Sequence, residues 1–419
     1  MKKINFLLLG IIFSFALQAQ QPFVPNYDES KVPAYQLPDP LRNADGTLVS
    51  DKAGWVERRA ELYTLLANEE FGNIPQWKGT LTFKEVSTRK IFDNKALRRE
   101  VQLTLSDNGK SILFNLLIFQ PVSSKPVPFF LGYNFDGNYT IVSDKDISLP
   151  VGWVANDKKF GIADNRAVEA ARGSDVSSWP VQEIVARGYG VVTLYYGDCD
   201  PDFDDGFQNG VHALYPEPRN NQSWGSIAAW AWGLSRVIDY IQLDHAFSSS
   251  QIIVIGHSRL GKAALWAGAA DERIAMVVSN NSGCGGAALS KRAYGETVGR
   301  INRAFPHWFC DNFKRYSENE VSLPFDQHEL LALIAPRPLY VASAEEDRWA
   351  DPKGEFLSCV AASPVYRILG LPGLPVTEMP LLNHPVMGTI GYHIRPGGHS
   401  ITLYDWMRYI DFANIHFKR

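Results

Sequence analysis

The sequence predicts one α/β domain in which a mostly parallel sheet carries helices on both faces. Two observations predict this fold class: period-two segments that form antiparallel hairpins come first, and apolar strand segments alternating with helical segments follow. Helices that connect parallel strands bury both faces of a sheet, and hairpins extend such a sheet at its edge. We therefore expect a three-layer sandwich over residues 20–419, with its antiparallel hairpins near the N-terminus.

Each element has its own signal. After an extended arm at 21–50, helical spacing predicts a helix over 52–70. Alternating residues on both sides of Asp107-Asn108-Gly109 predict a hairpin with a tight turn. The predicted strands are 127–131, 190–195, 252–255, 276–279 and 339–342, and the predicted helices are 222–242, 260–270 and 401–416.

The composition is that of a folded globular protein. Of the 419 residues 45% are hydrophobic, and the formal net charge is −4, which excludes a disordered chain and a strongly basic nucleic-acid binder. The four cysteines are too sparse for a disulfide scaffold and lack the CxxC spacing of zinc sites. We expect no nucleic-acid partner, no metal, no cofactor and at most one disulfide bridge.

The N-terminus has the pattern of an export signal. Lys2 and Lys3 precede an apolar segment at 4–17, and Ala19 supplies a small residue for cleavage. The apolar segment is shorter than the roughly 20 residues that cross a bilayer, so a short membrane anchor is the weaker alternative. We predict a signal peptide at 1–19 and a periplasmic or extracellular mature protein with no membrane association.

The segment Gly-His-Ser-Arg-Leu-Gly-Lys at 256–262 carries the strongest chemical signal. A buried strand precedes it and an Ala-rich helix follows, so Ser258 is expected on a sharp turn, as in a nucleophile elbow. The spacing from Gly256 to Lys262 also matches a phosphate-binding loop, but position 263 is alanine where that loop needs Ser or Thr. The elbow is preferred, with a phosphate loop or an inert turn as alternatives.

A serine nucleophile needs a base and an acid, which follow it in the chain of such hydrolases. One predicted strand ends in the acidic turn Glu345-Glu346-Asp347, and Asp347 lies furthest past its end. His399 lies in a Gly-rich loop before the last helix. We predict Asp347 as the acid and His399 as the base, and we expect His257 to point away from them.

The cations beside the serine indicate what is bound. The backbone N–H of Arg259 is a natural oxyanion donor, and its guanidinium adds a charge-assisted hydrogen bond. The segment at 130–138 ends an earlier strand and is expected to supply the second donor. Lys262 lies one helical turn from Ser258, where a cation suits a substrate with hydroxyls or negative charge.

Two other patterns are interpreted as structural. The acidic segment from Asp198 to Asp205 lacks the Gly and the final acid of an EF-hand, so we expect a solvated or helix-capping loop. Trp224, Trp230 and Trp232 are expected to pack in the core instead of forming a platform for sugars.

The 256–262 segment, Ser279-Asn-Asn-Ser-Gly-Cys-Gly-Gly286, Ala344-Glu-Glu-Asp-Arg-Trp349 and Gly398-His399 together resemble the bacterial glucuronoyl esterases of carbohydrate esterase family 15. The resemblance covers nearly all of the chain after the signal. It implies an α/β-hydrolase fold and metal-free hydrolysis of the esters that join 4-O-methyl-glucuronate groups of xylan to lignin alcohols.

The resemblance also implies roles for individual residues. Ser258 would be the nucleophile, His399 the base and Arg259 the oxyanion-stabilising side chain. The residues that would contact the hydroxyls and ring of the uronate are Lys262, Glu296 and Trp349.

This chain departs from the family pattern at the acid. Many members carry a catalytic glutamate at the position of Asn281, an amide that cannot be an anionic orienter, whereas Asp347 matches the alternative acid of bacterial members. Fungal members have a disulfide beside the serine and histidine, and this chain has no cysteine at either position. Cys284 and Cys359 are the pair suggested for a single bridge.

Two rival functions stay open at this point. One is an esterase for acetyl or feruloyl groups on xylan, and the other is a catalytically silent binding protein. The expected partner is a glucuronate ester of xylan or of a lignin–carbohydrate complex, acted on by a monomer.

Overall fold

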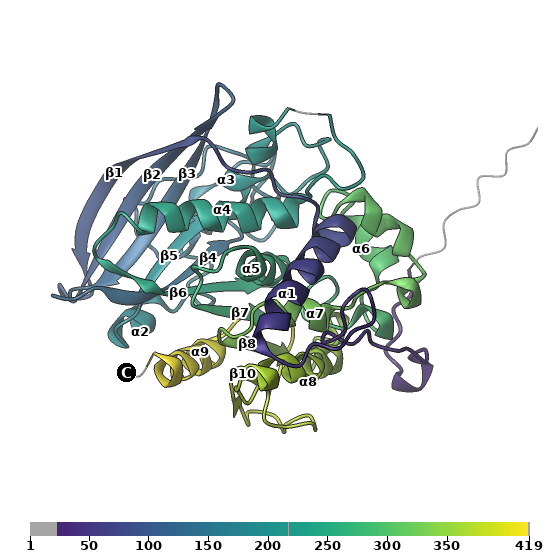
Figure 1. Cartoon of the computed structure of the whole chain (residues 1–419). Helices are drawn as coiled ribbons and strands as arrows, with labels where there is room; N and C mark the ends of the chain where they lie inside the picture. Colours follow the sequence, from purple (N-terminus) through teal and green to yellow (C-terminus); the bar gives the residue numbers. More distant parts are fainter. Residues whose placement is uncertain (1–22, 217, 418–419) are drawn as a thin grey trace, which may run out of the picture.

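The computed structural model describes residues 23–216 and 218–417, and a ten-stranded sheet runs through them (Figure 1). The predicted signal peptide lies outside the described residues. The strand order is β1-β2-β3-β5-β4-β6-β7-β8-β10-β9. The strands are β1 (Thr80–Ile91), β2 (Ala96–Asp107), β3 (Lys110–Pro121), β4 (Val127–Asn134), β5 (Gly190–Tyr195), β6 (Phe247–His257), β7 (Met276–Asn280), β8 (Leu339–Ala344), β9 (Val386–Met387) and β10 (Ile390–Arg395).

The sheet has a parallel centre and antiparallel edges. Strands β5, β4, β6, β7, β8 and β10 pair in parallel. Strands β1, β2 and β3 form successive antiparallel pairs and join the centre through β5, and β9 pairs antiparallel with β10. The turn between β2 and β3 has positive φ at Asn108 and Gly109, as the favoured two-residue hairpin turn requires. The predicted fold class is confirmed.

Helices form the two outer layers. Trp266 of α5 stacks on Tyr63 of α1 on one side of the sheet, whereas Tyr340 of β8 packs against Tyr409 and Phe412 of α9 on the other. The bounds of the helices are α1 (Lys52–Leu66), α2 (Val181–Ala186), α3 (Tyr196–Cys199), α4 (Ser226–Ile241), α5 (Arg259–Ala270), α6 (Val298–Ala304), α7 (Gln327–Ala332), α8 (Pro352–Ile368) and α9 (Leu403–His416). In the described residues no helix is long and apolar enough to cross a membrane.

The predicted arm runs along the surface of the later part of the chain. Glu29 forms an ion pair with Arg292 at 2.6 Å, and the carbonyl oxygen of Pro38 lies 2.9 Å from Nε2 of His328. Phe23 packs edge-on against Trp349, with ring centroids 5.9 Å apart. The arm therefore reaches one of the residues predicted to bind substrate.

The structure tests two predictions about side chains, the burial of the tryptophans and the suggested disulfide bridge. Trp224, Trp230 and Trp232 are buried, as expected of core residues. The suggested Cys284–Cys359 bridge is wrong, because all four cysteines are free and buried. Cys284 lies in the loop after β7 near the charges of Glu296 and Lys262, whereas Cys359 lies on the buried side of α8.

Candidate active site

Ser258 occupies the sharp turn between β6 and α5. Its backbone has φ 57° and ψ −130°, a strained conformation for a residue other than glycine. Its N–H donates to the carbonyl oxygen of Asn280 at 2.9 Å. A Cβ on Gly256 would lie 1.9 Å from the carbonyl oxygen of Leu260, so only glycine allows the chain to turn this closely. The turn therefore places Ser258 just beyond the carboxyl end of β6.

Asp347 and His399 lie in the loops that follow two neighbouring strands, β8 and β10, and the two side chains meet beside the Ser258 turn. Nδ1 of His399 lies 2.6 Å from Oδ2 of Asp347. Burial would raise the pKa of Asp347, but the hydrogen bond and charge of His399 outweigh it and hold the pKa below its usual value. Glu345 and Glu346 are exposed, whereas the Asp347 side chain is only 3% exposed, so it is the carboxylate of this turn that faces the imidazole.

Asn281 adds a second donor to the same carboxylate. Its Nδ2 donates to Oδ2 of Asp347 at 2.7 Å, and its own Oδ1 has no hydrogen-bond partner in the described part of the chain. An uncharged amide therefore donates to the carboxylate that faces His399. The sequence indicated that Asn281 is no anionic orienter, but it did not reveal this contact.

Arg259 is held by a carboxylate that the sequence did not single out. The Asp202 side chain, 3% exposed, forms an ion pair with Arg259 and lies 2.9 Å from Nε2 of His307. Trp308 also donates to Asp202 at 2.7 Å, and its ring lies 5.0 Å from the guanidinium carbon. Burial raises the pKa of Asp202, but the hydrogen bond from His307 and the Arg259 charge bring it below the usual value.

The acidic loop is therefore only partly as expected. Asp204 is exposed, but Asp202 is turned inward, where its buried carboxylate is paired with the partly exposed guanidinium of Arg259. Among residues 23–216 and 218–417 there is no group of at least 3 His, Cys, Asp or Glu side chains that could hold a metal ion. Alternating acids in the sequence did not distinguish Asp202 from its exposed neighbours.

A cavity of about 300 Å³ brings together all of the predicted site residues. Lys262 is buried there and donates to the carbonyl oxygen of Ser282 at 2.5 Å, and Oε2 of Glu296 lies 4.0 Å from its Nζ. Burial lowers the pKa of Lys262 and raises that of Glu296. The predicted residues that line this cavity are Ser258, His399, Asp347, Arg259, Lys262, Glu296 and Trp349.

His257 does not point away from the site, so that expectation is wrong. Its ring centroid lies 4.5 Å from that of His399, and its Nδ1 lies 2.6 Å from Oδ1 of Asn280. Burial, aided by the nearby His399, lowers the pKa of His257 to about 3. An uncharged imidazole therefore packs against the predicted base. The side chain of Asn280, on the neighbouring strand β7, holds the His257 ring beside His399. The sequence around His257 does not indicate this contact.

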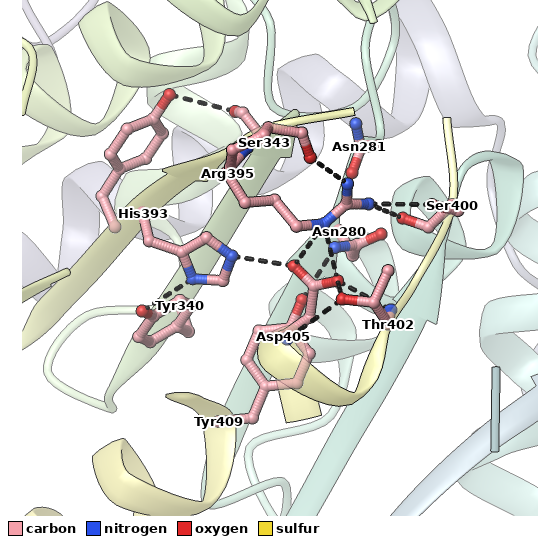
Figure 2. A network of polar contacts seen from close by, with 12 residues as sticks. Asn280, Asn281, Tyr340, Ser343, His393, Arg395, Ser400, Thr402, Asp405 and Tyr409 are labelled. Atoms are coloured by element: carbon pink, nitrogen blue, oxygen red, sulfur yellow. Dashed lines mark hydrogen bonds and ion pairs between the residues drawn. The ribbon is translucent and has the colours of Figure 1, made fainter. Parts of the chain in front are cut away.

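The loop at 396–400 is clamped by one arginine (Figure 2). Arg395 donates to the carbonyl oxygens of Pro396 at 2.9 Å, Gly398 at 3.4 Å and Ser400 at 2.5 Å. These carbonyls lie on both sides of His399, so a single guanidinium fixes the backbone that carries the imidazole.

Asp405 holds the clamp from α9. It accepts from Nε of Arg395 at 2.8 Å and from the N–H and hydroxyl of Thr402, each at 2.7 Å. Nε2 of His393 is 2.8 Å from Asp405, and its Nδ1 is 3.0 Å from the Tyr340 hydroxyl. Figure 2 shows these groups converging on one buried carboxylate. Neither this network nor β10, from which Arg395 and His393 come, was predicted from the sequence.

The segment at 130–138 lies beside the site through Phe135. Its ring lies 5.7 Å from the guanidinium carbon of Arg259 and 6.2 Å from the ring of His257. The side chain of Asn134 accepts from the N–H of Gly137 at 2.9 Å, which closes the turn after β4. This turn approaches Arg259, and its contribution of an oxyanion donor stays a prediction.

The comparisons with known proteins all identify relatives from the same family. The model that matches residues 173–370 describes a glucuronyl esterase of fungi. A carbohydrate esterase from an unknown prokaryotic organism is 47% identical over 403 residues, 94% of this chain and 93% of the relative.

Solved structures give the same result. A promiscuous CE15 esterase from a marine bacterial metagenome aligns with a TM-score of 0.89 at 47% identity, over 94% of this chain and 100% of that chain. A glucuronoyl esterase from Solibacter usitatus aligns with a TM-score of 0.86 at 42% identity, over 92% of this chain and 99% of that chain.

Proposed function

The chain belongs to carbohydrate esterase family 15, and we propose that it hydrolyses the ester between 4-O-methyl-glucuronate groups of glucuronoxylan and lignin alcohols. One observation carries this proposal. The strained Ser258 shares a cavity with a histidine whose Nδ1 is hydrogen-bonded to a buried carboxylate. That combination suits acyl transfer through a covalent serine ester.

The reaction follows from the positions of these groups. His399 takes the Ser258 proton as Oγ attacks the ester carbonyl carbon, and Asp347 stabilises the imidazolium that forms. The tetrahedral intermediate collapses when His399 returns the proton to the alcohol oxygen and the C–O bond breaks. Water then attacks the acyl-enzyme with the same base and releases the glucuronate.

Arg259 is the proposed charge partner of the oxyanion. Its backbone N–H directly follows the serine, and its Nε has no hydrogen-bond partner in the described residues, although the guanidinium is paired with Asp202. A donor that is already fixed needs no reorganisation when negative charge develops on the carbonyl oxygen. The ion pair and the aromatic rings around Arg259 supply that fixation.

The uronate is proposed to lie against Lys262, Glu296 and Trp349. Sugar hydroxyls both donate and accept hydrogen bonds, so a buried ammonium beside a carboxyl group offers both kinds of partner. The indole of Trp349 offers a flat apolar surface for the ring. A cavity built for acetyl or feruloyl esters has no comparable need for this buried charged pair, which favours the uronate over those rival substrates.

We also propose that the protein is exported and that it acts as a monomer. The signal pattern at 1–19 supports a periplasmic or extracellular enzyme that meets polymeric xylan outside the cytoplasm. No metal or cofactor has a role in the proposed reaction.

A substrate comparison tests the proposed function. We expect kcat/KM for benzyl glucuronate to exceed that for p-nitrophenyl acetate, and Lys262→Met to reduce hydrolysis of the glucuronate much more than that of the acetate. Equal rates on the two esters in the wild type, or equal losses in the variant, would instead indicate an esterase for neutral acyl groups.

A further inference from the structure

Two short segments, 294–296 and 348–349, carry Glu296 and Trp349, and these segments contact each other. The N–H of Glu296 donates to the carbonyl oxygen of Trp349 at 3.0 Å. The Trp349 side chain also makes a hydrogen bond to the Glu296 carboxyl group, which opposes the rise in its pKa that burial causes. Because of these two contacts, the positions of the two proposed uronate-binding residues depend on each other.

The N-terminal arm binds both segments through two successive carbonyl groups. The carbonyl oxygen of Asn26 accepts from the N–H of Gly295 at 2.9 Å. The carbonyl oxygen of Tyr27 accepts from the Tyr294 hydroxyl at 3.2 Å and from the Arg348 guanidinium. The arm therefore holds the residues that directly precede the two uronate contacts.

An acidic side chain of the arm bridges the same two parts of the chain. Glu29 forms ion pairs with Arg292 at 2.6 Å and with Lys353 at 2.8 Å, and Arg292 also pairs with Asp351 at 2.7 Å. Arg292 precedes one segment in the sequence and Lys353 follows the other. The Lys353 side chain is 49% exposed and that of Arg292 only 3%, so the pair with Arg292 is the main anchor.

At the other end of the arm, Phe23 contacts the Trp349 indole directly. The two rings are nearly perpendicular, at 86°, with centroids 5.9 Å apart, which is a favourable edge contact. The Arg300 guanidinium carbon lies 5.9 Å from the Phe23 ring, and the charge of Arg300 acts on Glu296. Among the described residues, Trp349 lines the cavity at Ser258 and Phe23 does not. Phe23 is therefore placed to act through Trp349.

We propose that residues 23–29 of the arm position Glu296 and Trp349, and that the arm thereby determines selectivity for a uronate over a small acyl group. This inference rests on the proposed function. A sugar ring needs an apolar surface and hydroxyl partners that are fixed relative to each other. An acetyl group needs only the serine turn and its oxyanion donors, so its hydrolysis does not depend on the arm.

Proton transfer at the site does not depend on the arm either. Asp347 directly precedes Arg348, but its carboxylate is held by His399 at 2.6 Å and by Asn281 at 2.7 Å. These two partners remain when the arm is altered. Loss of binding contacts alone raises KM and leaves kcat unchanged. The arm is therefore expected to affect KM for the uronate ester, whereas a general loss of fold would lower kcat on every ester.

Phe23→Ala tests the contact with Trp349, and Val24→Ala, at a neighbouring side chain that is 83% exposed, is the matched control. In Phe23→Ala, KM for benzyl glucuronate should rise by roughly fivefold, the effect of a lost ring contact, with kcat unchanged. Hydrolysis of p-nitrophenyl acetate should keep its wild-type rate. Phe23→Tyr retains the ring and should restore KM, and Val24→Ala should match the wild type on both esters.

Glu29→Gln tests the anchor at the other end of the arm. It should raise KM for benzyl glucuronate by roughly threefold, because a partly exposed ion pair contributes little. Asp28→Asn is its control, since the Asp28 side chain is 51% exposed and its ion pair, at 3.7 Å, is with Lys31 of the arm itself. This control should leave both KM values unchanged.

The results can separate failure of this inference from failure of the proposed function. Unchanged KM for benzyl glucuronate in both Phe23→Ala and Glu29→Gln would overturn the arm as a positioning element. Equal losses on the two esters would also overturn it, because they would indicate a general structural role. In either case a wild type that prefers benzyl glucuronate would leave the proposed function standing. A wild type that hydrolysed no glucuronate ester would remove the proposed function itself.

Discussion

The turn that carries Ser258 and the loop that carries His399 are held by different kinds of contact. The serine turn depends on backbone packing, with Gly256 against the carbonyl of Leu260 and the serine N–H bonded to β7. The histidine loop has one backbone hydrogen bond, from the N–H of Glu346 to the carbonyl oxygen of Gly397, and otherwise depends on the side chain of Arg395, which binds three carbonyl oxygens of the loop. The serine turn is therefore held by backbone contacts, whereas the histidine loop depends on side chains, the Arg395 guanidinium and the Asp405 carboxylate that binds it.

The difference predicts different consequences of mutation. A backbone contact cannot relax when a methyl group is added, so damage to the serine turn should appear as lost folding. A side-chain clamp can be loosened while the surrounding layers stay packed, so damage to the histidine loop should appear mainly as lost turnover.

Gly256→Ala should give the largest effect on the fold. The new Cβ would lie 1.9 Å from a backbone oxygen, a contact that no rotamer change relieves. We expect a loss of more than about 4 kcal/mol in the free energy of unfolding, measured by denaturant titration. Gly152→Ala is the control, since a Cβ there meets no atom within 4 Å. A stable Gly256→Ala protein would refute a turn held by backbone packing.

Among the changes around His399, Asp347→Asn should give the largest loss of turnover with the fold intact. An amide at this position can stabilise the wrong tautomer of His399 and cannot balance an imidazolium, for which a loss of roughly 10⁴ in kcat is typical. Glu345→Gln, at an exposed carboxylate of the same turn, should leave kcat unchanged. The reverse ranking in a benzyl glucuronate assay would move the acid to another residue.

Arg395→Met should reduce kcat by about 100-fold, because a shift of roughly 1 Å in a catalytic group has that cost. Arg395→Lys should recover only part of this, since an ammonium cannot reproduce the fork of contacts to Asp405 and the loop. The control is Arg408→Met, on the more exposed side of α9. Stopped-flow or steady-state rates that stay at the wild-type value in Arg395→Met would show that the clamp is dispensable.

Asn281→Ala should give the smallest effect. It removes one donor from Asp347, while the hydrogen bond to His399 remains. A hydrogen bond to a charged group contributes about 1.5 kcal/mol at the lower end of its range, which corresponds to a loss of roughly tenfold in kcat. A loss comparable to that of Asp347→Asn would mean that Asn281, and not the carboxylate alone, orients the imidazole.

Local patterns predicted the sheet, the serine turn and the residues that surround it. Ser258 and Lys262 are fixed relative to each other by one strand, one turn and one helix, so their spacing in sequence is also their spacing in space. Chain order, the place of Asp347 past a strand end and the Gly-rich loop around His399 together selected these two residues. Their positions at neighbouring strand ends follow from the parallel sheet.

Features that depend on long-range packing were missed. Asp202 differs from its acidic neighbours only because the fold brings Arg259 and His307 to it. Arg395 lies in a strand that was not predicted and Asp405 near the start of a predicted helix, and only the fold brings the two side chains together. The orientation of His257 was predicted wrongly for the same reason, because Asn280 on the neighbouring strand determines it.

Hydrolysis of benzyl glucuronate by Ser258→Ala shows whether Ser258 is the nucleophile. We expect a fall of roughly 10⁶ in kcat, to the level left by binding and oxyanion contacts alone, in a protein with wild-type stability. Wild-type protein quenched rapidly with acid and then digested should show, by mass spectrometry, one added glucuronoyl group on the peptide that contains Ser258. Turnover by Ser258→Ala at the wild-type rate would mean that another group is the nucleophile.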